Sequence, residues 1–303
     1  MVCSGPKVAV ATYNLYWWCI SNQFGNCPQF AVGTGFNQLY ERISANPVDL
    51  IGFQECEDVE QVTAGAGLVN FGYYSTPRGN DAPMAWSLAR FKVIEGPASE
   101  WVAQDSYSSR WLNWVRLLEY DSNDVIFFAN THGPLGQCTG EQGKKVAQGY
   151  LRSIWRHLKP RDTVIFTGDF NCRILDQTLV TLRESLQDCA WDTVFQAADH
   201  IFSGHGVGLC SQERVDGAPS DHQFLKAVLL PHGGPKPPKP KPKRQNKSAL
   251  APHGCPEAPS NGPCCRHCGS NRFCPSNGGC YADGQQGCPT ATCNPVSKEL
   301  LLL

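Results

Sequence analysis

Eight polar residues of the types that act on phosphate esters follow, or border, short apolar runs in this 303-residue chain. In chain order they are Asn14, Glu55, His132, Asp169, Asn171, Asp199, Asp221 and His222. Carboxylate and amide oxygens are preferred ligands of a hard cation such as Mg²⁺. Carboxylates and histidines can also move a proton during hydrolysis. The set therefore predicts metal-assisted hydrolysis of a phosphate ester.

The residue types suggest distinct roles within this set. Glu55, together with Asp221 or Asn14, would hold the cation. Asp169 would accept a proton from the attacking water or orient that water. Asn14 and Asn171 can hold a phosphoryl oxygen without adding charge.

Other polar and aromatic residues allow two interpretations. Asp199 behind His222 would keep that histidine protonated to a higher pH. Arg78 or Arg110 could contact the phosphate, although a solvated surface arginine is the commoner case. Tryptophans such as Trp18 could stack on bases, but aromatic side chains more often form core. Three acidic residues after Glu55 are interpreted as the first turn of a helix. They are Glu57, Asp58 and Glu60.

The run from Val164 to Asn171 shows how such residues would be positioned. It reads Val-Ile-Phe-Thr-Gly-Asp-Phe-Asn, which predicts a buried strand up to Phe166, after which the apolar run ends in Gly168, Asp169 and Asn171. In α/β sheets, ligands bind at the carboxyl ends of the strands. We therefore expect Asp169 and Asn171 to emerge at a binding site.

The remaining apolar patterns predict an alternation of strands and helices. Strands are expected at 7–13, 48–53, 84–88, 111–118, 125–129, 163–166, 200–202 and 224–230, and helices at 35–46, 57–68, 139–157 and 174–186. The turn at 121–124 would join two of these strands as a hairpin. Thr139 and Gln142 predict a capping box at the start of the third helix.

Six short motifs in this order resemble the endonuclease/exonuclease/phosphatase superfamily, in particular its deoxyribonuclease I-like members. They are Thr-Tyr-Asn at 12–14, Phe-Gln-Glu at 53–55, Asn-Thr-His at 130–132, Thr-Gly-Asp-Phe-Asn at 167–171, Asp-His-Ile-Phe at 199–202 and Ser-Asp-His at 220–222. The resemblance covers nearly the whole chain up to residue 222. It implies a four-layer α/β sandwich, in which helices flank two central mixed sheets and the site lies at one rim.

The resemblance also implies individual roles. Glu55 matches the metal ligand, with Asn14 beside it, and Asp221 matches a metal or phosphate-site residue. Asp169 and Asn171 match the pair that positions water and phosphate.

His222 matches the essential histidine of the superfamily, with Asp199 as its partner. His132 matches the second histidine of the nuclease, lipase and phosphatase branches, which disfavours the apurinic endonucleases. Cys172 and Arg173 stand where inositol polyphosphate 5-phosphatases carry a longer aromatic signature, so that branch is not matched.

Composition divides the chain into four parts. We predict a catalytic domain at 1–232, a Pro/Lys-rich linker at 233–252, a Cys-rich domain at 253–295 and a tail at 296–303. Up to Pro231 there are 17 basic and 24 acidic residues, whereas the linker region 232–252 adds six basic residues and no acids. An acidic body repels polyanions unless a cation or a local basic patch intervenes.

The 16 cysteines predict an oxidising compartment. We therefore expect an extracellular or secretory-pathway protein, although no signal peptide is visible in this chain. No apolar run is long enough to span a bilayer. The eight cysteines of the body would form disulfides or buried thiols. The eight in the tail favour disulfides, with zinc as the alternative because residues 264–268 read Cys-Cys-Arg-His-Cys.

The favoured interpretation is a secreted phosphodiesterase that uses Mg²⁺, or alternatively Mn²⁺ or Ca²⁺, and cleaves nucleic acid. One alternative is a phosphoesterase acting on phospholipids or phosphoinositides, and another is an inactive binding protein with the same fold. The Cys-rich tail could bind a polysaccharide or a surface.

Overall fold

The computed structural model describes residues 3–22, 25, 27, 34–75 and 82–231, together with the backbone of two short strands, β13 (Arg272–Phe273) and β14 (Asn294–Pro295). The chain forms two compact units, Met1–Pro237 and Pro238–Leu303. In the second unit, β13 and β14 pair antiparallel. The expected linker and the disulfides or zinc site of the tail lie outside the described residues, as does Arg78.

The first unit contains two mixed sheets of six strands each. The first sheet has the order β11 (Gly208–Val215), β12 (Phe224–Leu230), β1 (Val8–Asn14), β2 (Leu50–Gln54), β4 (Met84–Ser87) and β3 (Phe71–Tyr74). The second has the order β5 (Phe91–Gln104), β6 (Ser109–Glu119), β7 (Val125–His132), β8 (Thr163–Asp169), β10 (Asp199–Ser203) and β9 (Gln187–Trp191). Within these two sheets, β1 runs parallel to β2 and β7 runs parallel to β8, while the other neighbours are antiparallel.

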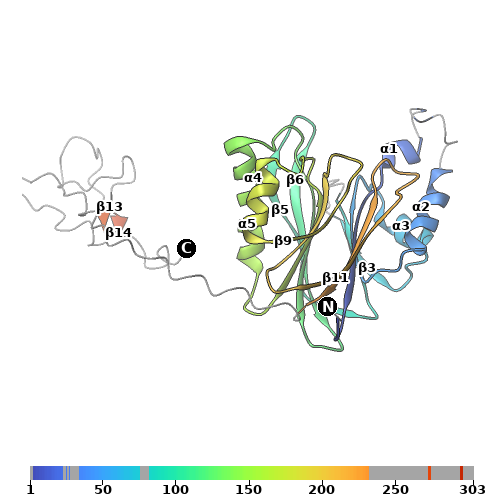
Figure 1. Cartoon of the computed structure of the whole chain (residues 1–303), viewed down its shortest axis with the longest axis horizontal. Coiled ribbons are helices and arrows are strands. Elements are labelled where there is room, and N and C mark those ends of the chain that lie inside the picture. The colour runs from blue at the N-terminus through green and yellow to red at the C-terminus, as the bar shows by residue number, and fades with distance from the viewer. Residues whose placement is uncertain are drawn as a thin grey trace, which may run out of the picture. The chain divides into compact units, whose positions relative to one another are not determined.

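Helices cover the outer face of each sheet (Figure 1). Helices α2 (Gly35–Ser44) and α3 (Val59–Gly65) lie on the first sheet, and α4 (Gly140–His157) and α5 (Gln177–Ser185) lie on the second. The short helix α1 (Trp17–Ile20) follows β1 directly. Three groups of buried apolar side chains fill the spaces between the layers. This is the four-layer α/β sandwich that the family resemblance implies.

The continuous apolar runs form strands that are buried on both faces. Along β8, Ile165 points into the central core between the sheets, whereas Val164 and Phe166 pack under the helices of the second sheet. The same alternation places Phe128 in the central core and Phe127 under the helices. Because successive side chains of a strand point to opposite faces, a strand between two apolar layers has no polar side.

A buried polar network, here called the inter-sheet clamp, joins the two sheets near the rim. Asn130 of β7 donates from Nδ2 to the carbonyl of Phe53, 2.7 Å away, and its Oδ1 accepts from Gln54 at 2.8 Å and Thr167 at 2.9 Å. Gly52 of β2 permits this approach, because a Cβ there would lie 2.2 Å from Asn130 Oδ1. The clamp therefore sets how the two sheets lie against each other at the rim.

Within the first unit, four strands and one helix were not predicted from the sequence: β3, β5, β9, β11 and α1. Most side chains of β5 and β11 are partly or fully exposed, so these edge strands carry little apolar periodicity. β5 also contains Gly96 and Pro97, which are typical strand breakers.

Two predicted helix starts are corrected. Thr139 stands at the N-cap of α4, but its side chain makes no capping hydrogen bond, so the predicted capping box is wrong. Helix α5 begins at Gln177 instead of residue 174, because Arg173 donates its backbone N–H to the Asp176 carboxylate, 2.8 Å away. The backbone N–H of Asp176 in turn donates to the carbonyl of Arg173 at 2.8 Å, so residues 173–176 form a turn ahead of the helix.

Three disulfides cross-link the first unit: Cys3–Cys210, Cys19–Cys27 and Cys138–Cys172. Two further cysteines, at positions 56 and 189, are buried and not in disulfides. The body cysteines are thus the disulfides and buried thiols that the sequence suggests. Within the described part of the chain, no helix combines the length and apolar character that a membrane crossing requires.

Candidate active site

Three of the predicted side chains lie in a row across three strands of the second sheet. The register of β7 with β8 places His132 beside Asp169, and the register of β8 with β10 places Asp199 on the other side of Asp169. Strands β7 and β8 end at this rim, and the antiparallel strand β10 begins there. The sheet itself therefore brings these three residues together.

The carboxylate of Asp169 is buried and surrounded by hydrogen-bond donors. Its Oδ2 accepts from Asn14 Nδ2 at 3.0 Å, and its Oδ1 accepts from the backbone N–H of Asn171 at 2.7 Å. His132 Nε2 lies 3.7 Å from Oδ2, and His222 Nε2 lies 4.0 Å from it. Burial would raise the pKa of Asp169, but the positive charges of His222 and His132 and the two hydrogen bonds outweigh burial and lower it. Asp169 is therefore held as an anion.

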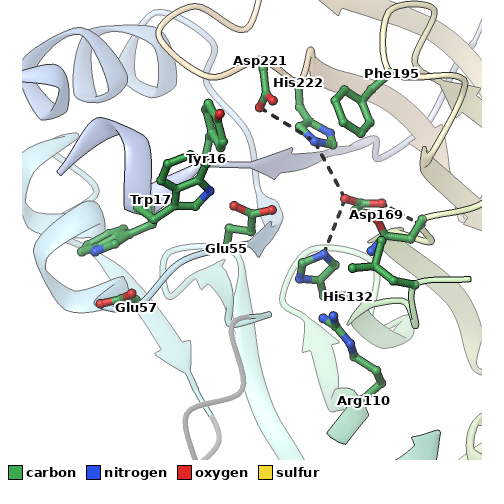
Figure 2. A pocket seen from close by; sticks show the side chains of 13 residues that line it. Tyr16, Trp17, Glu55, Glu57, Arg110, His132, Asp169, Phe195, Asp221 and His222 are labelled. Carbon is green, nitrogen blue, oxygen red and sulfur yellow. Dashed lines mark hydrogen bonds and ion pairs between the residues drawn. The ribbon is translucent and has the colours of Figure 1, made fainter. Parts of the chain in front are cut away.

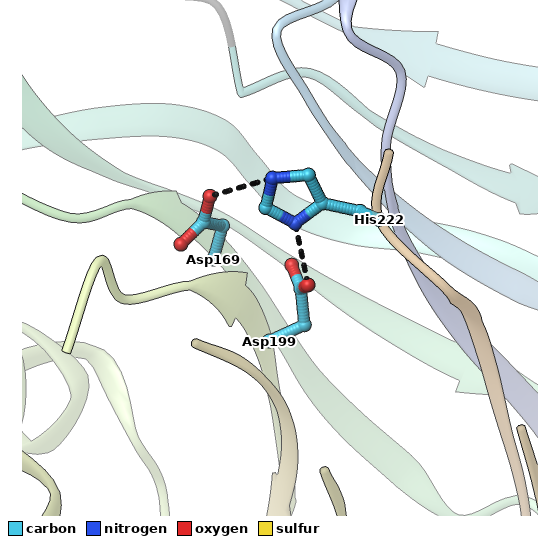
Figure 3. Close-up of side chains that lie close together, drawn as sticks. All are labelled: Asp169, Asp199 and His222. Carbon is cyan, nitrogen blue, oxygen red and sulfur yellow. Dashed lines mark hydrogen bonds and ion pairs between the residues drawn. The ribbon is translucent and has the colours of Figure 1, made fainter. Parts of the chain in front are cut away.

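His222 bridges two carboxylates (Figure 3). Its Nδ1 lies 2.7 Å from Asp199 Oδ2, and its Nε2 faces Asp169. Burial acts to lower the pKa of His222, but the negative charges of Asp199 and Asp169 outweigh burial and raise it. These three residues could be taken for a metal site, since their ligand atoms lie within 4.8 Å of one another. The direct contact of Nδ1 with Oδ2 leaves no room for an ion between them, so we interpret the group as a hydrogen-bonded relay.

Glu55 lies across the site from these residues, immediately after β2. Its Oε1 accepts from Asn14 Nδ2 at 3.3 Å, whereas its buried Oε2 has no hydrogen-bond partner among the described residues. Burial, only partly offset by His132, raises the pKa of Glu55. A buried carboxylate oxygen without a protein partner suits coordination of a cation. Asp221, whose side chain is 39% exposed, could supply a second oxygen to the same cation.

A pocket of about 430 Å³ contains most of these groups (Figure 2). It is lined by Tyr16, Trp17, Trp18, Glu55, Glu57, Arg110, His132, Leu135, Asp169, Asn171, Phe195, Asp221 and His222. Two predicted site residues stand behind this wall. Asp199 lies behind His222, and Asn14 has both ends of its amide occupied, because its Oδ1 also accepts from the backbone N–H of Tyr16 at 3.0 Å.

Arg110 lines the pocket and is only 4% exposed, so its interpretation as a surface arginine is wrong. Its Nε donates to Asp105 Oδ2 at 2.8 Å. Asp105 also accepts hydrogen bonds from the backbone N–H groups of Tyr107, Ser108 and Leu135. These contacts outweigh the effect of burial and lower the pKa of Asp105 to about 2. Asp105 thus fixes both Arg110 and Leu135 at the edge of the pocket.

Phe195 is a pocket residue that the sequence did not indicate. Its ring stacks on the His222 imidazole, with the centroids 4.2 Å apart and the planes 26° apart. Asp192 holds this loop, since its Oδ1 accepts the backbone N–H groups of Val194, Phe195 and Ala197. A loop aromatic carries no periodic signal, so only the tertiary structure could reveal it.

The sequence pointed more clearly to other residues of the pocket. Trp18, which is 42% exposed at the rim, belongs to the aromatic group directly after Asn14. Glu57 was expected in the first turn of a helix, but α3 begins at Val59. Asp58 is the N-cap of α3, and its side chain accepts a hydrogen bond from the backbone N–H of Gln61 at 2.9 Å. Glu57 therefore precedes the helix, and it lines the pocket.

Three pocket residues have left-handed backbone conformations: Tyr16 with φ 55°, Glu55 with φ 46° and Asn171 with φ 53°. Asparagine tolerates this region, but tyrosine and glutamate adopt it at a cost. Non-glycine residues with such backbone angles are concentrated at functional sites. Each of the three lies within two residues of a strand end, where the turn directs the following chain around the pocket.

Comparison with solved structures shows the same fold in other proteins. An endonuclease/exonuclease/phosphatase from Bacteroides vulgatus is 18% identical with a TM-score of 0.62, over 74% of this chain and 99% of that one. A mannosyl-6-phosphatase from Bacteroides thetaiotaomicron is 17% identical with a TM-score of 0.60, over 74% and 99%. TDP2 from D. rerio, complexed with a single-strand DNA product, is 15% identical with a TM-score of 0.55, over 74% and 99%.

No curated protein matches the chain. A family model does match, over residues 31–222, and this segment contains every predicted site residue except Asn14. The match extends over more than half of the chain. The enzymes for which the family is named hydrolyse phosphate esters. The chain therefore belongs to the Endonuclease/Exonuclease/phosphatase family.

Proposed function

We propose that this protein is a divalent-cation-dependent phosphodiesterase that cleaves nucleic acid. The observation that supports this most strongly is the environment of Asp169, an anion held between two histidines, 3.7 Å and 4.0 Å from their Nε2 atoms. An acceptor of a proton must be ionised and must face the place where water attacks. Asp169 meets the first condition through its lowered pKa and the second by lining the pocket.

Glu55 and Asp221 are the residues that would hold the cation, favoured as Mg²⁺. Glu55 fits because its Oε2 has no protein partner among the described residues, and Asp221 fits because its carboxylate lines the same pocket. Asn14 orients Glu55 through the 3.3 Å hydrogen bond. When bound, such a cation neutralises negative charge on the phosphoryl and leaving oxygens.

The protein groups would divide the remaining work. Asp169 accepts a proton from water as the water oxygen forms its bond to phosphorus and the bond to the leaving oxygen breaks. His222, kept protonated by Asp199, and His132 face the same space and would stabilise negative charge on the phosphoryl oxygens. Asn171 donates its backbone N–H to Asp169 and its side-chain Nδ2 to the carbonyl of Gly133, at 3.0 Å, so its Oδ1 is oriented by the loop.

Nucleic acid is favoured over other phosphodiesters by the rim of the pocket. Exposed Trp18 and the neighbouring Tyr16 form an edge-to-face pair with ring centroids 4.9 Å apart, which offers a surface for base stacking. Arg110 adds a positive charge to the pocket wall. The three disulfides support an extracellular setting.

A panel assay tests this proposal. Plasmid DNA, RNA, sphingomyelin, a phosphoinositide and soluble phosphomonoesters would each be incubated with the protein and Mg²⁺, with EDTA as the control. DNA or RNA cleavage that EDTA abolishes supports the proposal. Turnover of lipid or of phosphomonoesters alone would instead identify those compounds as the substrate class. A folded protein that hydrolyses none of the substrates would be a binding protein.

A further inference from the structure

A second pocket, of about 310 Å³, adjoins the first. The two pockets share three wall residues: Leu135, Asn171 and Phe195. Leu135 and Phe195 are 44% and 41% exposed, respectively, so they border the opening instead of sealing it. A ligand whose scissile phosphate occupies the first pocket can therefore extend past these side chains into the second.

Two connections give the second pocket a defined shape. The disulfide Cys138–Cys172 lies in its wall and joins the loop after β7 to the loop after β8. Arg173 donates from Nε to Gln196 Oε1 at 2.7 Å, which connects the loop after β8 to the loop that carries Phe195. Both Arg173 and Gln196 line the pocket.

Arg173 brings a guanidinium group with spare donors to this pocket. Its Nε is occupied by Gln196, but its two Nη groups make no hydrogen bond or ion pair within the described part of the chain, and the residue is exposed. The one acid of the pocket, Asp176, already accepts the backbone N–H of Arg173 at 2.8 Å. It also stands at the start of α5, where the helix dipole offsets its charge.

A guanidinium whose two Nη groups have no partner among the described residues can pair with two oxygens of a phosphate. Arg173 lies two residues after Asn171, so their Cα atoms are at most about 7 Å apart. That separation suits a phosphate next to the one being cleaved. The apolar edges of Leu135 and Phe195 would then face the nucleoside that links the two phosphates.

We propose that the second pocket binds the phosphate adjacent to the scissile one, with Arg173 as its main donor. This inference rests on the proposed cleavage of nucleic acid and assigns one further contact to that substrate. Arg173 would act in binding the substrate and not in the chemical step.

The test compares substrates with and without the second phosphate. The dinucleotide TpT carries only the scissile diester, whereas pTpT and TpTp each carry one additional terminal phosphate. We expect the unaltered protein to cleave one of the two phosphorylated forms with a kcat/KM about tenfold above that for TpT, which corresponds to one additional charge-assisted contact. The phosphorylated form with the higher kcat/KM would show whether the second pocket lies on the 5′ or the 3′ side of the scissile phosphate.

Variants then assign the gain to Arg173. In Arg173→Gln the tenfold advantage should disappear, while kcat/KM for TpT and for bis(p-nitrophenyl) phosphate should stay within about twofold. Arg152→Gln, which removes an exposed charge from α4 outside both pockets, should keep the advantage. Gln196→Ala removes the partner of Nε but leaves the guanidinium, so most of the advantage should remain.

Binding provides a readout that needs no turnover. The affinity for a fluorescently labelled oligonucleotide, measured by anisotropy in EDTA, should fall about tenfold in Arg173→Gln, and its dependence on log[salt] should become shallower by about one. Arg152→Gln should change neither quantity. The inference is overturned if Arg173→Gln binds as the unaltered protein does, or if it loses TpT and pTpT activity equally. A lack of cleavage of any nucleotide by the unaltered protein would instead refute the proposed function.

Discussion

The two sheets of the sandwich contribute different kinds of groups to the site. The first sheet supplies the acidic residues suited to a cation, Glu55 and Asp221, together with the aromatic rim. The second supplies the row that would manage water and protons, with Asp169 at its centre. The contacts that connect these halves include the hydrogen bond from Asn14 to Asp169 and the approach of His222 to both Asp199 and Asp169.

This division shows that the site depends on how the sheets lie against each other. The cation side, Glu55 and Asp221, comes from the first sheet, whereas the proton side combines Asp169 and Asp199 of the second sheet with His222, which precedes β12 of the first. The inter-sheet clamp around Asn130 lies directly beneath the rim and fixes their relative position. We therefore expect the size of the loss of activity or stability to depend on the part that a variant changes. The four parts tested below are Asp169, the inter-sheet clamp, the pair of His222 with Asp199, and the edge of the pocket.

The largest effect should come from the proton side. Asp169→Asn removes the negative charge while keeping the size and most of the hydrogen bonds, so kcat should fall about 10³-fold with little change in stability. Steady-state kinetics on the best substrate of the panel measures this. Asp121→Asn, in an exposed turn, is the matched control and should retain full activity. A kcat for Asp169→Asn within tenfold of the unaltered value would contradict the assigned role.

The next effect should come from the clamp. Asn130→Ala leaves several buried acceptors and donors without partners, and we expect the free energy of unfolding to fall by about 3 kcal/mol. Gly52→Ala should lower both stability and activity, because the new Cβ would lie 2.2 Å from Asn130 Oδ1 and 2.2 Å from Thr167 Oγ1. Urea unfolding measures the change, with Gln212→Ala on exposed β11 as the control. If Asn130→Ala is as stable as that control, the clamp does not hold the sheets together.

The bridge between His222 and Asp199 should have a somewhat smaller effect. His222→Ala and Asp199→Asn should each lower kcat about 10²-fold, because the aspartate acts through the histidine. The double variant should lose no more than His222→Ala alone, since residues that act as a unit are non-additive. If instead the two losses multiply, the residues act independently, and Asp199 does not act through His222.

The smallest predicted effect concerns the pocket edge. The pKa of Asp105 is lowered to about 2 from 3.8, so its ionised form stabilises the fold above pH 4, and this stabilisation is lost as the pH falls towards 2. The side chain is 1% exposed, and the shift corresponds to about 2 kcal/mol. Asp105→Asn should therefore lower the free energy of unfolding by about 2 kcal/mol at pH 7 and by much less near pH 2. A difference that does not shrink on acidification would exclude this charge as the cause.

Much of the fold follows from local patterns in the sequence. Buried strands such as β8 and amphipathic helices such as α4 produce a recognisable pattern of apolar residues in the sequence, because each must present apolar side chains to one or two layers. The edge strands β5 and β11 show little of this pattern, because most of their side chains are partly or fully exposed to solvent. The pattern therefore weakens where burial weakens.

For the site, the sequence determined which residue types stand at the strand ends. Glu55, His132 and Asp169 could be named because polar residues at the ends of apolar runs are conspicuous, and His222 because it stands just before one. The tertiary structure decided which of them touch: strand register placed Asp169 between His132 and Asp199.

Three contacts near the pocket carried no signal in the chain. Asn130 reaches across to the first sheet, Phe195 stacks on His222, and Arg110 is buried against Asp105. The first two join residues far apart in the sequence and exist only after the two sheets have packed. The third joins residues five apart, but the burial of Arg110 depends on the loops around the pocket and leaves no periodic pattern in the sequence.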